Sequence, residues 1–258
     1  MALTGDLEGQ VVAAAAGDRA IRSYPAVLST EVTATAWARQ GAPSGAVVVA
    51  DYQASPRGRG GLPWTVRQGH GLGFTLLARP ELPPDREGWP YVPALLALHD
   101  VLGADDTGLT WPDTLHGPGG DAEARLGVYV ELGPSRTEWV SITVLVEAAQ
   151  PPRAPLLAQL VEALEQRLAA PAEQVLADYL PRCTTVGQHL RARLIPMGPG
   201  GPEVTGEAVD VLTDGALVLL TQRGNRVAVP PHNLGLLEPP AAEPEPPAEL
   251  LGIPLRRT

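Results

Sequence analysis

Short apolar runs separated by Gly- and Pro-containing segments fill most of the first 150 positions, and they predict a series of strands. The expected strands lie at about 21–28, 45–53, 71–80, 109–115, 125–132 and 137–148. The second is a valine-rich run with turn residues on both sides, which is typical of a buried strand. The last two are joined by Gly133, Pro134 and Ser135, so we expect them to pair as neighbours.

Helical spacing of apolar residues separates these runs. One helix is expected to begin with Ser29 or Thr30 as its N-cap and to end at Gly41. Val32, Ala36 and Trp37 stand at helical spacing within it. A second helix is expected over 89–103. The segment 154–180 predicts two more, because Pro171 interrupts the pattern.

After the helices the pattern changes to short alternating segments with Thr-Asp-Gly and Arg-Gly-Asn turns, the signature of a small β-barrel. The last 20 residues are rich in Pro and Glu and are expected to be largely disordered. We therefore expect an α/β domain over 1–182, a small β domain over 183–238 and a tail over 239–258.

Charge and composition exclude several classes of protein. The net charge is −10 and the pI about 5.0, which argues against a nucleic-acid binder because no basic excess exists to neutralise phosphates. The single cysteine, Cys183, cannot form an internal disulfide, and the five histidines show no metal-binding spacing. The N-terminus lacks the basic start of a signal peptide and no apolar run reaches membrane-spanning length, so we expect a cytoplasmic protein without membrane contact.

All 19 basic residues are arginine, and the chain contains no lysine. GC-rich coding explains this, since Ala, Gly, Pro and Arg are enriched together. Avoidance of lysine modification is the alternative interpretation.

The loop DYQASPRGRGGLPW, residues 51–64, places Arg57 and Arg59 among glycines and prolines. Arginine forks bind phosphate and carboxylate oxygens bidentately and stay charged at any working pH. Glycines let the backbone approach an anion closely. The loop therefore predicts an anion clamp, with a solvated Arg-Gly turn as the alternative.

The order strand, Ser-Thr, helix, strand, then Gln53, Arg57-Gly-Arg59 and Trp64, resembles the catalytic domain of the biotin–protein ligases, in the biotin/lipoate ligase superfamily. A Trp-Pro strand, the strand Gly127–Glu131 and a C-terminal run VTGEAVDVLTDGALVL follow in the family's order. The resemblance implies an α+β fold: a catalytic domain with a mixed or antiparallel sheet flanked by helices, plus a small SH3-like β-barrel.

The resemblance also implies roles for individual residues. Ser29, Thr30, Gln53, Gly127 and Val128 match biotin-binding positions, as does Val130 along the biotin tail. Arg57 and Arg59 match the loop that closes over biotin and the adenylate phosphate, and Trp64 and Asp113 match nucleotide-side positions. The implied substrates are biotin and ATP, with Mg²⁺ accompanying ATP. The implied partner is a biotin carboxyl carrier domain, and a homodimer is compatible with the family.

The sequence departs from the family at the reacting centre. The family's Lys-Trp-Pro-Asn-Asp becomes Thr110-Trp-Pro-Asp-Thr, so a neutral hydroxyl replaces the principal cation. Removing one well-placed electrostatic group commonly costs about 10²–10³ in rate. Arg125 is our candidate replacement.

Further departures lie on the phosphate side. Gly60 and Leu62 replace arginines, Pro56 replaces a glycine, and VSITVLVEA replaces the family's glycine- and asparagine-containing strand.

Two functions therefore stay open: a working biotin–protein ligase, and a non-catalytic or repurposed homologue that binds biotin, an acyl-adenylate or a carrier protein. A lipoate or octanoyl transferase is a third, weaker alternative, because Cys183 lies far from the site in sequence and is expected to be a small buried residue. His70 follows the clamp loop and is a further ligand-contact candidate, with an exposed loop histidine as the alternative.

Overall fold

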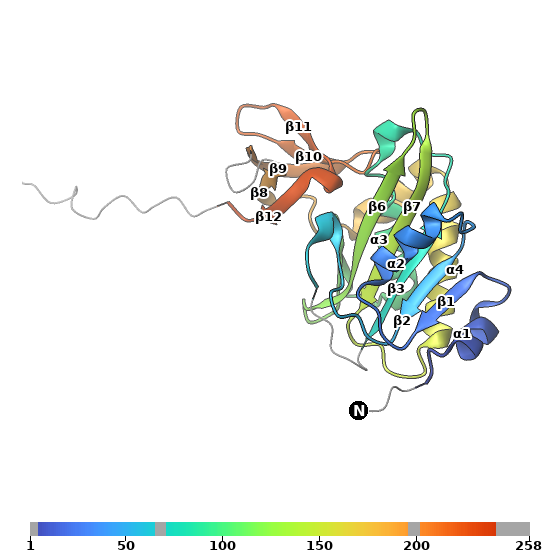
Figure 1. Ribbon diagram of the computed structural model, residues 1–258. Coiled ribbons are helices and arrows are strands. Elements are labelled where there is room, and N and C mark those ends of the chain that lie inside the picture. The colour runs from blue at the N-terminus through green and yellow to red at the C-terminus, as the bar shows by residue number, and fades with distance from the viewer. Residues whose placement is uncertain (1–4, 65–70, 196–201, 241–258) are drawn as a thin grey trace, which may run out of the picture.

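The computed structural model describes residues 5–64, 71–195 and 202–240, and it contains two β-sheets with five α-helices (Figure 1). His70 and residues 241–258 of the predicted tail lie outside the described residues. No helix in the described part of the chain is long and apolar enough to cross a membrane.

The larger sheet has seven strands in the order β1-β2-β3-β7-β6-β5-β4. Its strands are β1 (Ile21–Tyr24), β2 (Val47–Ala50), β3 (Leu72–Ala78), β4 (Gly108–Thr110), β5 (Thr114–His116), β6 (Ala122–Leu132) and β7 (Thr137–Val146). The β1–β2 pair is parallel and the other pairs are antiparallel, so the sheet is mixed, as predicted. The expected pairing of the two strands around Gly133 is confirmed.

The sheet separates two hydrophobic layers because its side chains alternate between the faces. Helices α1 (Gly9–Ala16), α3 (Tyr91–Leu102) and α4 (Ala154–Ala169) cover one face and enclose the main core. Helix α2 (Thr30–Arg39) covers part of the other face, packing on Val48, Leu77 and Trp139 (Figure 1). Helix α5 (Ala172–Tyr179) follows α4 after the break at Pro171, as the sequence predicts.

The second sheet is antiparallel, in the order β11-β10-β9-β8-β12. Its strands are β8 (His189–Leu194), β9 (Glu203–Val211), β10 (Leu217–Leu220), β11 (Arg226–Val229) and β12 (Leu234–Glu238). Arg86 donates two hydrogen bonds to the Thr213 carbonyl, and Trp111 Nε1 donates to the Gly215 carbonyl at 3.0 Å. These bonds attach the β9–β10 turn to the main domain.

Two local expectations were wrong. The first strand ends at Tyr24, before Pro25, rather than at residue 28. The expected helix is confirmed as α2, which buries Thr30, Ala34 and Ala38 and leaves Val32 exposed, because the small residues allow the helix to lie close on the sheet.

The second concerns residues 109–115, which we predicted as one strand. They form a tight hairpin of β4 and β5, with a cis peptide bond between Trp111 and Pro112 at its turn.

Candidate functional site

A chain of buried polar side chains begins at the N-terminus of α2. Gln53 Oε1 accepts hydrogen bonds from Thr30 N at 2.8 Å and from Thr30 Oγ1 at 3.0 Å. Thr75 Oγ1 donates to Thr30 Oγ1 at 3.0 Å and lies 2.9 Å from Thr143 Oγ1. All four side chains are buried. Because the shared hydrogens fix the direction of each bond, this network holds Gln53 in one orientation.

The strand register places this network on the α2 face of the sheet. Thr75 of β3 lies opposite Thr143 of β7, which lies opposite Gly127 of β6. At Gly73, a Cβ atom would lie 2.4 Å from Gln53 Nε2, so only glycine leaves room for the glutamine amide. The hydroxyls of Thr75 and Thr143 thus form a polar row on this face of the sheet, and Gly73 and Gly127 lie beside them without side chains.

Ser29 adds a hydroxyl that the protein itself does not use. It is 1% exposed, and its Oγ has no hydrogen-bond partner within the described residues. Ser29 occupies the N-cap position of α2 in an extended conformation, but its side chain makes no capping bond. A buried hydroxyl without a partner is costly. An uncharged polar ligand at this point would satisfy it.

The loop 56–64 closes on itself beside the polar row. Trp64 N donates to the Pro56 carbonyl and Gly58 N donates to the Leu62 carbonyl. A Cβ atom at Gly58 would lie 1.9 Å from Trp64 Nε1, so the indole packs directly on the glycine. A Cβ atom at Gly127 would lie 2.7 Å from the Gly58 carbonyl carbon. The two glycines therefore let the loop lie against β6.

Arg59 is held by the protein. Its Nε donates to Asp113 Oδ2 at 2.8 Å, and its NH1 donates to the Leu234 carbonyl at the start of β12. The other Asp113 oxygen accepts from the Thr114 hydroxyl. The sequence-based roles placed Arg59 on the phosphate and Asp113 on the nucleotide; the structure joins them to each other and to the C-terminal sheet.

Arg57 is exposed and makes one hydrogen bond that the structure describes, to the Gly61 carbonyl at 3.0 Å. Glu31, in the first turn of α2, lies close enough for their charges to interact. Burial raises the pKa of the Glu31 carboxyl, and the positive charge of Arg57 opposes that shift. Of the two loop arginines, Arg57 is therefore the one available to an incoming anion.

No family model matches the chain. Its sequence is 28% identical over 239 residues to the biotin–[acetyl-CoA-carboxylase] ligase of Mycobacterium tuberculosis, and that match covers 83% of this chain and 88% of the relative. The chain is a biotin–protein ligase homologue. It also matches the bifunctional ligase/repressor BirA of Bacillus subtilis at 34% identity, over only 28% of that relative's length.

Solved structures agree on the fold. The biotin protein ligase of Aquifex aeolicus, in complex with biotin and ATP, matches with a TM-score of 0.62 at 18% identity, covering 85% of this chain and 99% of that one. A biotin acetyl coenzyme A carboxylase synthetase from Helicobacter pylori matches with a TM-score of 0.57 at 16% identity, covering 82% and 100%. A biotin–protein ligase fold thus surrounds the polar row and the arginine loop.

The position of the family's lysine lies near the second sheet in this biotin–protein ligase homologue. Thr110 Oγ1 is 3.2 Å from Thr184 Oγ1. Arg125, our candidate replacement, lies opposite Thr114 in the β5–β6 pair and is half exposed, with its Nε 3.9 Å from Glu147 Oε1. Thr114 also lies opposite Thr110, so Arg125 stands in the same row as Thr110, two strands away, without a hydrogen bond to it among the described residues.

Sequence reasoning missed four residues of the site: Thr75, Thr143, Glu31 and Tyr91. The Tyr91 hydroxyl lies 3.4 Å from both Val128 N and Val128 O. Burial raises the Tyr91 pKa well above its usual value, although the nearby Arg59 charge opposes the shift, so the phenol stays neutral. The sequence signal for Thr75 and Thr143 was their place inside two apolar strands, because a hydroxyl in a buried strand needs a polar partner.

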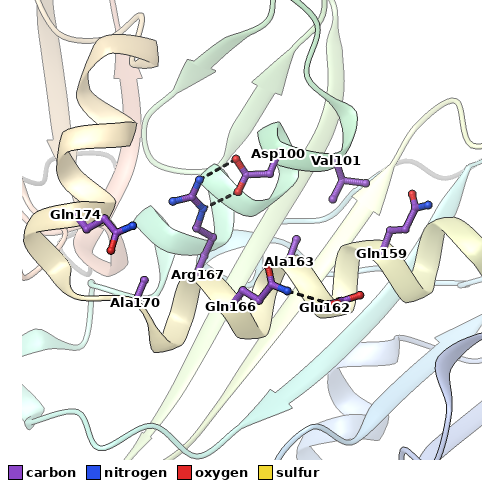
Figure 2. Close-up of a pocket in the computed structure, with 9 residues that line it drawn as sticks. All are labelled: Asp100, Val101, Gln159, Glu162, Ala163, Gln166, Arg167, Ala170 and Gln174. Atoms are coloured by element: carbon purple, nitrogen blue, oxygen red, sulfur yellow. Dashed lines mark hydrogen bonds and ion pairs between the residues drawn. The ribbon is translucent and has the colours of Figure 1, made fainter.

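A groove of about 600 Å³ lies elsewhere, on α3, α4 and α5 (Figure 2). Most of its lining residues are polar, and Arg167 reaches from α4 to bond both oxygens of Asp100. The helices α3 and α4 cover the sheet face opposite to the polar row. This groove is therefore separate from the candidate site. Among the described residues, no three His, Cys, Asp or Glu side chains come together to hold a metal ion.

Proposed function

We propose that the protein binds biotin at the N-terminus of α2 and activates it with ATP. The observation that carries the proposal is the buried neutral set of Ser29, Thr30 and Gln53, in which a bonded network orients the glutamine and one hydroxyl is left unpaired. A urea ring is uncharged and offers both donors and acceptors. Such a site favours it over a charged group, which would lose its hydration without a counter-charge.

The proposed reaction has two steps. A biotin carboxylate oxygen attacks the α-phosphorus of ATP, and the bond to the β-phosphate oxygen breaks to release pyrophosphate. The neutral amine of a carrier-protein lysine then attacks the carbonyl carbon of biotinyl-AMP, AMP leaves with the bonding electrons, and the amine loses one proton to solvent to give the amide. Arg57 would neutralise charge as the two anions approach. Arg59 would act mainly by holding the loop to Asp113 and the second sheet.

The remaining assignments of the proposal rest on the family. Gly127 and Val128 would lie along the biotin tail, Val130 further on, and Trp64 near the nucleotide. Mg²⁺ would arrive with ATP, the partner would be a biotin carboxyl carrier domain, and a homodimer is compatible with it. We further propose domain limits of 1–182 and 183–238, a tail over 239–258, and an SH3-like architecture for the second sheet.

A non-catalytic binding protein is the second candidate, and the environment of Thr110 favours it. The described residues place no arginine in contact with Thr110, and its hydroxyl is matched with that of Thr184. The site would then hold biotin or an acyl-adenylate without forming the anhydride efficiently.

Biotin-dependent exchange of labelled pyrophosphate into ATP separates the two candidates. Exchange above the rate of an Arg57→Ala control would support adenylation. Tight biotin binding by calorimetry without exchange would support the binding protein. Absence of both, in folded protein, would contradict the proposed site.

A further inference from the structure

A buried ion cluster lies on the far side of β2 from the biotin site. Arg153, the residue before α4, is 1% exposed. Its backbone N and its Nε donate to Asp6 Oδ2, at 2.7 and 3.1 Å, and its NH2 donates to Asp6 Oδ1 at 2.7 Å. The same NH2 donates to Asp51 Oδ1. Neither the family resemblance nor the proposed chemistry uses this cluster.

The contacts of Arg153 with Asp51 and Gly71 lie at the two ends of one segment. Asp51 directly follows β2 and stands two residues before Gln53. Arg153 NH1 donates to the Gly71 carbonyl at 3.1 Å, one residue before β3 begins. One guanidinium thus bonds the point where the chain leaves the sheet and the point where it returns. The segment between them carries Gln53, Arg57 and Arg59.

The return point is fixed tightly. Gly71 has φ +77°, and a Cβ atom there would lie 2.3 Å from the Val146 carbonyl oxygen. The chain can re-enter the sheet at this place only as glycine, and the carbonyl of that glycine faces Arg153. A planar fork with five donors suits this task, because it can bond two separate chain segments and a carboxylate at once.

The cluster is poorly explained by stability alone. Burial opposes the charge on Arg153, but its hydrogen bonds to Asp6 and Asp51 outweigh burial and raise the pKa of the guanidinium. Even so, buried ion pairs are often no more stable than apolar residues of equal volume. What a buried pair offers beyond an apolar cluster is direction, since each bond requires one geometry.

We propose that Arg153 is a positioning residue, which fixes Asp51 and Gly71 and, through Asp51, sets the places of Gln53 and of the loop 56–64. The inference rests on the proposed function for its effect on ligand, but its structural part stands separately. Asp51 begins a short backbone pairing that leads to the site: Asp51 N donates to the Tyr24 carbonyl, Val27 N to that of Tyr52 and Ala54 N to that of Val27. The Asp51 side chain is the point at which the guanidinium holds this pairing.

The test compares Asp51→Ala with Asp6→Ala in the full chain. Each removes one carboxylate from the same guanidinium, but only Asp51 belongs to the segment. Backbone hydrogen exchange is measured on the peptides that contain Ala54, Gly58 and Trp64, and on α4 as an internal reference. We expect Asp51→Ala to raise exchange in the segment roughly tenfold relative to α4, and Asp6→Ala to leave that ratio unchanged. Arg153→Lys, which keeps the charge but loses the fork, should behave as Asp51→Ala does.

Biotin affinity is the second readout. Asp51→Ala and Arg153→Lys should raise the Kd for biotin about tenfold. The maximal rate of pyrophosphate exchange should change little, because the groups that take part in the chemistry are intact once biotin is bound. If Asp51→Ala does not fold, Asp51→Asn replaces it. Equal ratios of hydrogen exchange, segment against α4, in the folded Asp51 and Asp6 variants would overturn the positioning role of Arg153. A wild-type protein that does not bind biotin would refute the proposed function. The hydrogen-exchange comparison would then still decide whether Arg153 positions the segment.

Discussion

Gln53 and Thr30 are bonded twice, from the backbone N and the hydroxyl of the threonine to one amide oxygen, across 23 positions of sequence. The bonds connect the exit of β2 with the first residue of α2. They leave the Gln53 amide nitrogen and the Ser29 hydroxyl as the polar groups available to a ligand. The Thr30 groups and the Gln53 oxygen therefore build the site, whereas the Gln53 nitrogen and the Ser29 hydroxyl are the groups that would bond the ligand.

Ser29→Ala should affect mainly biotin affinity, and Thr30→Val should affect mainly the stability of the fold. Ser29 Oγ has no partner in the described protein, so Ser29→Ala should change the free energy of unfolding by less than about 0.5 kcal/mol. It should weaken biotin binding by about 1 kcal/mol, the net contribution of one neutral hydrogen bond. Thr30→Val instead leaves buried partners unpaired and should destabilise the fold by about 1–3 kcal/mol. Urea unfolding and calorimetric titration with biotin check both values.

The comparison has a clear failure. A Ser29→Ala protein that loses stability as Thr30→Val does would mean that the serine is structural. Unchanged biotin affinity in a folded Ser29→Ala protein would remove Ser29 from the ligand site.

Arg57 and Arg59 should respond differently to the same truncation. Arg57→Ala should weaken binding of a non-hydrolysable biotinyl-adenylate analogue by about 1.5–3 kcal/mol, the range for a charge-assisted bond, with an unchanged urea midpoint. Arg59→Ala removes the bonds to Asp113 and Leu234 and should lower the free energy of unfolding by about 1–2 kcal/mol. Identical affinity losses without any stability difference would contradict this division of roles.

Much of this arrangement was visible in the sequence. Valine runs gave the central strands, Pro171 gave the break between α4 and α5, and the spacing of Gln53, Arg57, Arg59 and Trp64 indicated the biotin–protein ligase family. These features are local, so neighbouring residues are enough to reveal them. The domain limits and the individual ligand roles stay predictions.

The missed features depend on pairing between distant strands. Thr75 and Thr143 are 68 positions apart, and only the β3–β7 register brings their hydroxyls to 2.9 Å. The engagement of Arg59 by a carbonyl of β12 requires the position of the second sheet, which no local pattern encodes. The buried face of α2 was not predicted, because it is formed by Thr30, Ala34 and Ala38, which are small and little distinctive in sequence.

Glu31 should make ligand binding depend on pH. Burial raises the pKa of its carboxyl above 4.5, and the carboxylate lies near Arg57, where an anionic ligand is expected. An anion favours the protonated form of Glu31, so affinity for the adenylate analogue should increase as pH falls from neutral toward that pKa. Glu31→Gln should bind more tightly at neutral pH and should lose this dependence on the acid side of neutrality. A Glu31→Gln protein with the same pH profile as the wild type would assign the dependence to another group.

Thr110→Lys tests whether the missing cation limits the chemistry. Thr110 contacts Thr184 through its hydroxyl and is only partly buried, so a longer side chain has an outlet to solvent and should be tolerated. Restoring one positive charge at the reacting centre should raise biotin-dependent pyrophosphate exchange by about 10²-fold if the remaining site is intact.

Thr110→Met is the matched control, because it adds comparable length without charge. Since the chain has no lysine, a biotin amide detected by mass in Thr110→Lys but not in Thr110→Met lies at position 110, which separates self-labelling from turnover. Exchange equal to that of Thr110→Met, with biotin affinity preserved, would show that Arg57 already supplies the needed charge or that the site does not adenylate at all. The Arg57→Ala exchange rate then distinguishes these two outcomes, because only a working site has a rate to lose.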